Sequence, residues 1–219
     1  MASEALVRSH RRERSLIPPG IHIPVAEHSE LTGLIGAWML TEACREAACW
    51  STPRLSINIS ARRLQSSVLP NQLAAVLEQS GLLPDWLELE LAASSLVGSS
   101  AGTLLALSAL RDLGIGLALD DFGTGSGSLS VLRRLPLTTV KLGRSLMCEL
   151  PMSQEDGPTV RAVIKAGRAT RLTTVAVGIE TEAQRAFLSG IGCDEGQGHF
   201  FSQPLPAGQL RPMLDTARA

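Results

Sequence analysis

The feature that most constrains the fold is a repeated alternation of short β-type runs with segments of helical period. Seven β-type runs fall at residues 5–8, 55–59, 86–91, 115–120, 138–142, 173–178 and 195–200. Segments of helical period fall at 31–48, 72–78, 103–113, 160–171 and 181–188. The first of these helical segments has Leu34, Ile35, Trp38, Met39 and Ala43 on one face. Such alternation predicts a parallel sheet or barrel covered by helices.

Uncommon polar residues stand at or near the carboxyl ends of the β-type runs. They are Asn58, Glu90, Asp120, Asp121, Lys141 and Gln197. In a (β/α)8 barrel these strand ends converge on one mouth, where active sites form. A doubly wound sheet also binds ligands at its carboxyl edge, but at one crevice rather than along nearly every strand. The pattern therefore favours a barrel, although only seven strands are counted where a closed barrel has eight.

Two adjacent acidic residues, Asp120 and Asp121, end an apolar run and enter a glycine-rich segment that begins at Gly123. Adjacent carboxylates repel one another unless a proton or a cation lies between them, so the pair indicates a divalent-metal site. The alternative is an acidic turn, in which Asp120 caps the next helix and Gly123 supplies a positive φ. The pair alone leaves both interpretations open.

The composition indicates one globular domain over residues 1–219, with 44% hydrophobic and 19% charged residues. A net charge of -1 and 3% aromatic residues argue against a nucleic-acid polymer as the partner. No apolar stretch is long enough to span a membrane. The four cysteines show no metal-binding spacing, so we expect reduced core thiols in a cytoplasmic protein.

Short motifs in a fixed order resemble the EAL domain, a bacterial phosphodiesterase module that linearises cyclic di-GMP. The motifs are Glu4-Ala5-Leu6 with Arg8, Asn58-Ile59-Ser60, Leu87 to Glu90, Asp120 to Gly125, Val140-Lys141-Leu142, Gly178 to Glu182 and Gln197-Gly198. The resemblance extends from Glu4 to about Ala207. It implies a TIM-like (β/α)8 barrel of the EAL type, whose mouth binds cyclic di-GMP and, in active members, two Mg²⁺ or Mn²⁺ ions.

The resemblance implies a set of metal ligands. Glu4, Asn58, Glu90 and Asp120 match the ligands of a first ion, and Asp120 bridges to a second ion that Asp121 also faces. Hard divalent cations prefer carboxylate and amide oxygens of this kind.

The resemblance also implies catalytic and ligand-binding roles. Lys141 matches a lysine that orients or activates the attacking water, so Lys141, Glu4 and Asp120 are the expected catalytic residues. Arg8 matches an arginine that holds a ligand phosphate, a task suited to a planar fork of donors. Gln197 matches a glutamine at the mouth, so Arg8, Asp121 and Gln197 are the expected ligand-binding residues.

Each of these residues also has a structural interpretation when it is taken alone. Glu4 near the start of the chain is more often solvated, Asn58 is able simply to end a strand, and Lys141 is usually a surface charge. The arginines that follow Arg8 are expected to lie in a solvated loop: Arg11, Arg12 and Arg14.

The chain departs from the family pattern around the expected mouth. Val177 replaces the glutamate that holds the second metal ion, and an isopropyl group cannot coordinate a cation. Gly143 replaces an aspartate, and Ala93 replaces a glutamate that steadies the Asp120–Asp121 loop. Glu180 is an alternative ligand if the loop around it is rebuilt. Two further departures are Ser9 and Gln203. The substitutions predict one intact metal site and an impaired second site.

The pattern also predicts an N-terminally truncated barrel without its usual first strand, because only three residues precede Glu4. An open barrel leaves two strand edges unpaired, so either the chain is a truncated copy or a second copy or a partner protein covers the opening. The leading function is an EAL domain that binds cyclic di-GMP with little or no hydrolysis. The alternatives are an active metal-dependent phosphodiesterase that produces linear pGpG, and a catalytically dead protein-interaction module.

Overall fold

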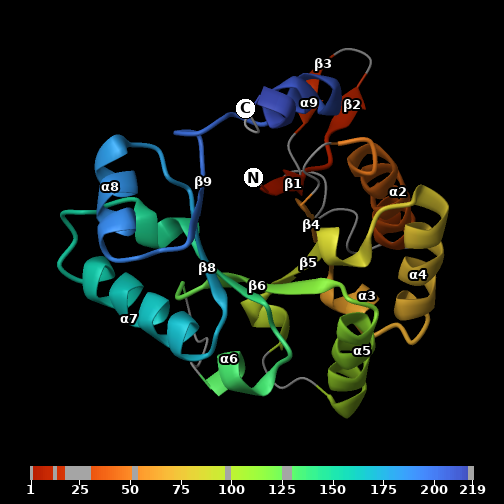
Figure 1. Cartoon of the computed structure of the whole chain (residues 1–219), viewed down its shortest axis with the longest axis horizontal. Coiled ribbons are helices and arrows are strands. Elements are labelled where there is room, and N and C mark those ends of the chain that lie inside the picture. Colours follow the sequence, from red (N-terminus) through yellow and green to blue (C-terminus); the bar gives the residue numbers. More distant parts are fainter. Residues whose placement is uncertain are drawn as a thin grey trace.

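The computed structural model describes residues 2–11, 14–17, 31–50, 54–96, 100–124 and 130–216. Its main sheet has seven parallel strands in the order β1-β4-β5-β6-β7-β8-β9. Their bounds are β1 Ala2–Ala5, β4 Arg54–Asn58, β5 Leu87–Ala92, β6 Gly116–Phe122, β7 Thr139–Leu142, β8 Thr173–Val177 and β9 Glu195–Gln197. The sheet curls so that β1 and β9 face one another across an open side (Figure 1).

Helices cover the outer face of this curled sheet (Figure 1). The α-helices are α2 Leu31–Ala47, α3 Ala61–Leu64, α4 Leu69–Ser80, α5 Ala101–Asp112, α6 Ser130–Arg134, α7 Asp156–Ala169, α8 Glu182–Gly190 and α9 Ala207–Thr216. Short 3-10 helices are η1 Pro84–Trp86, η2 Ala93–Leu96 and η3 Arg144–Met147. In the described part of the chain, no helix combines the length and the apolar character needed to cross a membrane.

The strand order confirms the barrel prediction over the doubly wound alternative. A doubly wound sheet reverses its strand order at a switch point, whereas this order follows the chain from β1 to β9 without reversal. The seven described strands therefore form part of a TIM-like barrel that is open between β1 and β9.

Alternation along the strands separates an apolar outer layer from a polar interior. Leu87, Leu89 and Leu91 of β5 are buried with at most 1% of their surface exposed and belong to the main hydrophobic core. Glu88 and Glu90 lie between them and project to the other face, because successive side chains of a strand alternate. Packing against the helices thus drives the leucines outward and places the carboxylates inside the barrel.

Two expectations for the N-terminal segment are wrong. The first strand spans Ala2–Ala5 rather than residues 5–8, because Glu4 pairs in register with Ser56 of β4. The arginine-rich segment forms an antiparallel pair of strands, β2 Ser9–Arg11 and β3 Arg14–Ile17, instead of a solvated loop. Arg12 lies outside the described residues.

Part of the expected apolar face of the first helix is exposed to solvent in the structure. Leu34 and Trp38 of α2 are 67% and 59% exposed, and the buried contacts come from Leu40, Cys44 and Ala47. The expectation of core thiols holds for Cys44, whereas the exposed cysteines are Cys49 and Cys148; all four cysteines are free.

We expect Gly198→Ala to lower the free energy of unfolding by about 1–3 kcal/mol. A Cβ atom at this position would overlap the backbone of Ile179, whose amide donates to the carbonyl oxygen of Gln197 (3.0 Å). Gly190→Ala is the matched control, since nothing lies within 4 Å of its added Cβ. Urea unfolding checks the pair, and equal stability of the two variants would contradict the close-approach argument.

Candidate active site at the mouth of the barrel

Glu4 links the two ends of the curled sheet. Its Oε1 accepts from Nδ2 of Asn58 on β4 (2.7 Å), and its Oε2 accepts from Nε2 of Gln197 on β9 (2.6 Å). Nζ of Lys141 lies 3.5 Å from the same Oε2. Four residues that the sequence predicts for the site therefore meet in one hydrogen-bonded group at the carboxyl ends of the strands.

A buried ion pair forms the floor of this group. Nζ of Lys141 on β7 donates to Oε1 of Glu90 on β5 at 2.6 Å, and the two side chains are 5% and 1% exposed. Oε2 of Glu90 is buried and has no hydrogen-bond partner among the described residues. A buried carboxylate oxygen without a donor is unfavourable, so it marks a place where a cation or a donor stabilises the site.

Glu90 and Asp120 have raised pKa values because they are buried and lie near other carboxylates. Burial raises the pKa of Glu90 to about 7; the charges of Glu4 and Asp120 add to the rise, and Lys141 opposes it. Burial also raises the pKa of Asp120, again against the effect of Lys141. Burial lowers the pKa of Lys141, but the surrounding carboxylates outweigh this effect and leave it above its ordinary value.

We expect the stability of the protein in EDTA to fall as the pH rises from about 4.5 to 7. In this window the native state keeps the proton on Glu90 that the unfolded chain has already released, so the unfolded state gains relative stability with pH. The comparison is with Glu90→Gln, which cannot titrate. Urea unfolding at pH 5 and pH 7 should give a larger loss for the unchanged protein, and equal losses would refute the assignment.

Asp120 and Asp121 end β6 in different environments. The Asp120 side chain is half-buried, whereas Asp121 is exposed and has a positive φ of 57°. A Cβ atom at Gly143 would overlap Cγ2 of Thr124 and lie 2.9 Å from Oδ1 of Asp121. The glycine thus lets the loop after β6 pack directly on the end of β7.

The end of β8 offers no ligand for a metal ion. Val177 is half-buried and pairs in register with Gln197, so the two side chains project to the same face of the sheet. Glu180 does not replace the missing carboxylate, because its Oε1 pairs with Nη2 of Arg144 (2.7 Å) on the exposed surface. Sequence reasoning missed this ion pair, for which the only signal was an arginine next to Gly143.

The remaining predicted residues are less closely tied to this group. Arg8 lies three residues beyond the end of β1 and donates to the carbonyl oxygen of Val7 (3.1 Å); among the described residues it pairs with no carboxylate. Ala93 is half-buried in η2 and packs against the core. Gln203 is exposed, and Ser9 lies on β2.

The donor chemistry of the mouth fits one divalent cation. The oxygens of Glu4, Asn58, Glu90 and Asp120 are the kind that Mg²⁺ and Mn²⁺ prefer, and Oε2 of Glu90 needs a partner. In the described ranges, no three acidic, histidine or cysteine side chains are grouped to hold an ion as they stand. The ammonium of Lys141 lies between Glu90 and Glu4, so an ion would require these side chains to move apart.

A curled sheet of parallel strands, with carboxylates, an amide and a lysine at one mouth, defines the chain as a TIM-like barrel protein with a candidate phosphate- or metal-binding site. The family model for the EAL domain matches residues 1–204. The chain therefore belongs to the EAL domain family.

Known proteins resemble this chain in sequence, and one solved structure resembles it in fold. The bifunctional diguanylate cyclase/cyclic di-GMP phosphodiesterase MucR of Pseudomonas aeruginosa is 37% identical over 212 residues, which cover 94% of this chain and 31% of MucR. The cyclic di-GMP phosphodiesterase NbdA of the same organism is 37% identical over 220 residues, 98% of this chain and 28% of NbdA. The solved PaMucR phosphodiesterase in complex with c-di-GMP is 36% identical, has a TM-score of 0.90, and covers 95% of this chain and 87% of its own.

The chain spans about a third or less of the length of these two curated relatives, at 31% and 28%.

Proposed function

We propose that this EAL domain binds cyclic di-GMP and hydrolyses it little or not at all. The observation that supports the proposal is the end of β8, where Val177 presents an isopropyl group beside Gln197. Gly143 at the end of β7 adds no donor side chain. Of the ligands expected for a second metal ion, only Asp120 and Asp121 would remain. The donors for a first ion remain: Glu4, Asn58, Glu90 and Asp120.

The retained residues are suited to holding the dinucleotide. One Mg²⁺ or Mn²⁺ ion at the mouth would supply positive charge to a phosphate oxygen. Arg8 would donate to a phosphate through its guanidinium, and Gln197 would orient Glu4 through their hydrogen bond. Lys141 would keep a proton on its ammonium group beside Glu90, because the surrounding carboxylates raise its pKa.

The impaired site explains the expected lack of turnover. Two-metal hydrolysis stabilises the attacking and the leaving oxygens, and each ion contributes several kcal/mol. Losing roughly 4 to 6 kcal/mol of this stabilisation slows the reaction by about three to four powers of ten.

We expect saturable binding of cyclic di-GMP in Mg²⁺ buffer and an affinity at least about tenfold lower for Arg8→Ala. Calorimetric titration measures both. Lys165→Ala is the control, since it removes an exposed cation from α7 on the outside of the barrel. An unchanged affinity of Arg8→Ala would contradict the assignment of this arginine to the ligand phosphate.

An active phosphodiesterase is the second candidate, because the first donor set and Lys141 are all present at the mouth. This function requires linear pGpG as a product, and its formation must disappear in Glu4→Ala.

An interaction module is the third candidate, and the open side of the sheet supports it. Across this opening, the described contacts are made by side chains: Glu4 with Gln197, and Arg54 with Glu195 at 2.6 Å. Among the described strands, none pairs with the outer edges of β1 and β9, which would allow a second copy of the chain to pair there. A stable dimer in light scattering would support this function, and a monomer would count against it.

A further inference from the structure

The barrel contains a second polar site at the opposite end of the strands from the mouth. A cavity of about 280 Å³ lies among the amino-terminal ends of β4, β5, β6, β7 and β8. Its polar lining includes Ser56, Glu88 and Thr139. Each of these stands two residues before a residue of the mouth and projects to the same face of its strand.

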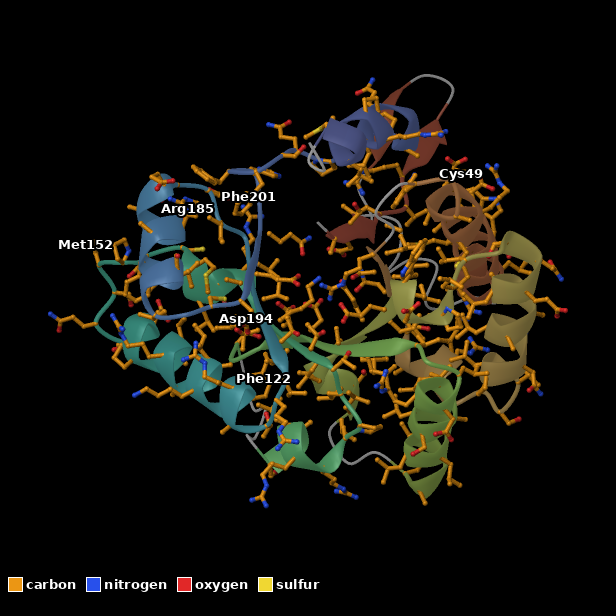
Figure 2. All side chains as sticks on the ribbon, viewed as in Figure 1. Cys49, Phe122, Met152, Arg185, Asp194 and Phe201 are labelled. Atoms are coloured by element: carbon orange, nitrogen blue, oxygen red, sulfur yellow. The ribbon has the colours of Figure 1, made fainter. Side chains whose placement is uncertain are left out.

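The cavity exists because small residues replace the bulky interior of an ordinary barrel. Barrel interiors are usually filled by layers of valine, isoleucine and leucine. Here Ser56, Gly116, Thr139 and Thr173 line the lower layer and leave room beside Glu88. Figure 2 shows side chains of the strands extending into the space that the curled sheet encloses.

Glu88 is a half-buried carboxylate without a cationic partner. Oγ of Ser56 donates to its Oε1 (3.3 Å), and the hydroxyl of Thr139 donates to its Oε2. Within the described ranges, no lysine, arginine or histidine nitrogen lies within 4.0 Å of the Glu88 oxygens. The hydroxyls fix the carboxylate but place no positive charge in direct contact with it, and such a contact is favourable for a half-buried charge.

Two arginines that also line the cavity, Arg54 and Arg111, are held by other partners. Arg54 pairs with Glu195 at 2.6 Å, and Nη1 of Arg111 donates to the carbonyl oxygen of Ile115 at 2.7 Å. Neither guanidinium therefore contacts the Glu88 carboxylate, whose oxygens stay open to the donors of a ligand.

We propose that this cavity binds a small primary amine, with its ammonium group on Glu88. An ammonium has three donors and suits an acceptor set of one carboxylate and nearby hydroxyls. A metal ion suits it less, because no group of three acidic, histidine or cysteine side chains is found in the described residues. Trp86, which is half-buried, also lines the cavity and offers apolar surface to the short body of such a ligand. Its volume is near the lower end of the range for small-ligand pockets.

The test is a titration of the ¹⁵N-labelled protein with n-butylammonium chloride, followed by two-dimensional NMR. The proposal expects saturable shifts of amides that line the cavity, including those of Ser56, Glu88 and Thr139. n-Butanol and sodium pentanoate carry the same butyl chain without the positive charge and should give no saturable shift. Equal shifts with butanol, or no saturable shift with butylammonium, would overturn the proposal. This test uses only the unchanged protein.

Two variants refine the test. Glu88→Gln should weaken butylammonium binding about tenfold or more, since a hydrogen bond to a charged group is lost. Glu78→Gln removes the same charge from the exposed face of α4 and should leave the affinity unchanged. An unchanged affinity of Glu88→Gln would refute the assigned carboxylate. These measurements use no nucleotide, so they stand apart from the function proposed for the mouth.

Discussion

Replacing Val177 with glutamate is expected to raise the rate of cyclic di-GMP hydrolysis by on the order of a hundredfold. The new carboxylate would project beside Gln197 at the mouth and give a second metal ion a ligand that Asp120 and Asp121 cannot supply alone. This gain in rate is smaller than the loss attributed above to the impaired second metal site, because Gly143 still supplies no donor side chain. A side chain there would overlap Thr124, so restoring an aspartate would first require the loop after β6 to move.

Val177→Gln is the matched control for this change. It has nearly the shape of glutamate but lacks the negative charge that a second ion needs, so it should leave hydrolysis at the level of the unchanged protein. Chromatographic detection of linear pGpG in Mn²⁺ buffer measures all three proteins. No gain in Val177→Glu, with cyclic di-GMP binding retained, would show that the end of β8 does not limit turnover.

Replacing Lys141 with methionine is expected to lower the free energy of unfolding by about 3–5 kcal/mol at pH 8 in EDTA. The change removes the ammonium that faces Glu90 at 2.6 Å and Glu4 at 3.5 Å, and it leaves a carboxylate that is 1% exposed without compensation. Added Mg²⁺ should stabilise this variant more than the unchanged protein, because a cation can then occupy the place of the ammonium.

The double variant Lys141→Met/Glu90→Gln separates the effect of charge on stability from the effect of packing. Removing both charges should recover at least half of the stability that the single variant loses, since an uncompensated buried carboxylate no longer remains. Urea unfolding compares the three proteins. A single variant within about 1 kcal/mol of the unchanged protein would contradict the view that Lys141 compensates the buried acids.

The parts of the fold that could be predicted are those that the residue pattern within a single strand or helix determines. Strands such as β5 alternate leucine with glutamate, and this period of two identifies both the strand and its buried face. The β2 and β3 pair was missed because its alternation is obscured by arginines. The exposure of Leu34 and Trp38 depends on which side of α2 other elements cover, and helical period alone does not reveal this.

The site was predictable in its residues but not in its contacts. Glu4, Asn58, Glu90, Lys141 and Gln197 meet as expected, because the carboxyl ends of parallel strands share one edge. The sequence did not reveal that Lys141 pairs with Glu90 or that Glu180 is held by Arg144. These pairings depend on side-chain directions and separations that only the packed barrel defines. The roles assigned to all of these residues, and to Asp120, Asp121 and Arg8, stay predictions.

The most direct measurement is to saturate the purified protein with cyclic di-GMP in Mg²⁺ buffer, isolate the complex, and identify the released nucleotide by chromatography. Our account predicts that cyclic di-GMP is recovered intact after prolonged incubation. Stoichiometric recovery of linear pGpG would contradict the account and show that the site turns over despite Val177. Absence of any bound nucleotide on folded protein would also contradict it and favour the interaction module.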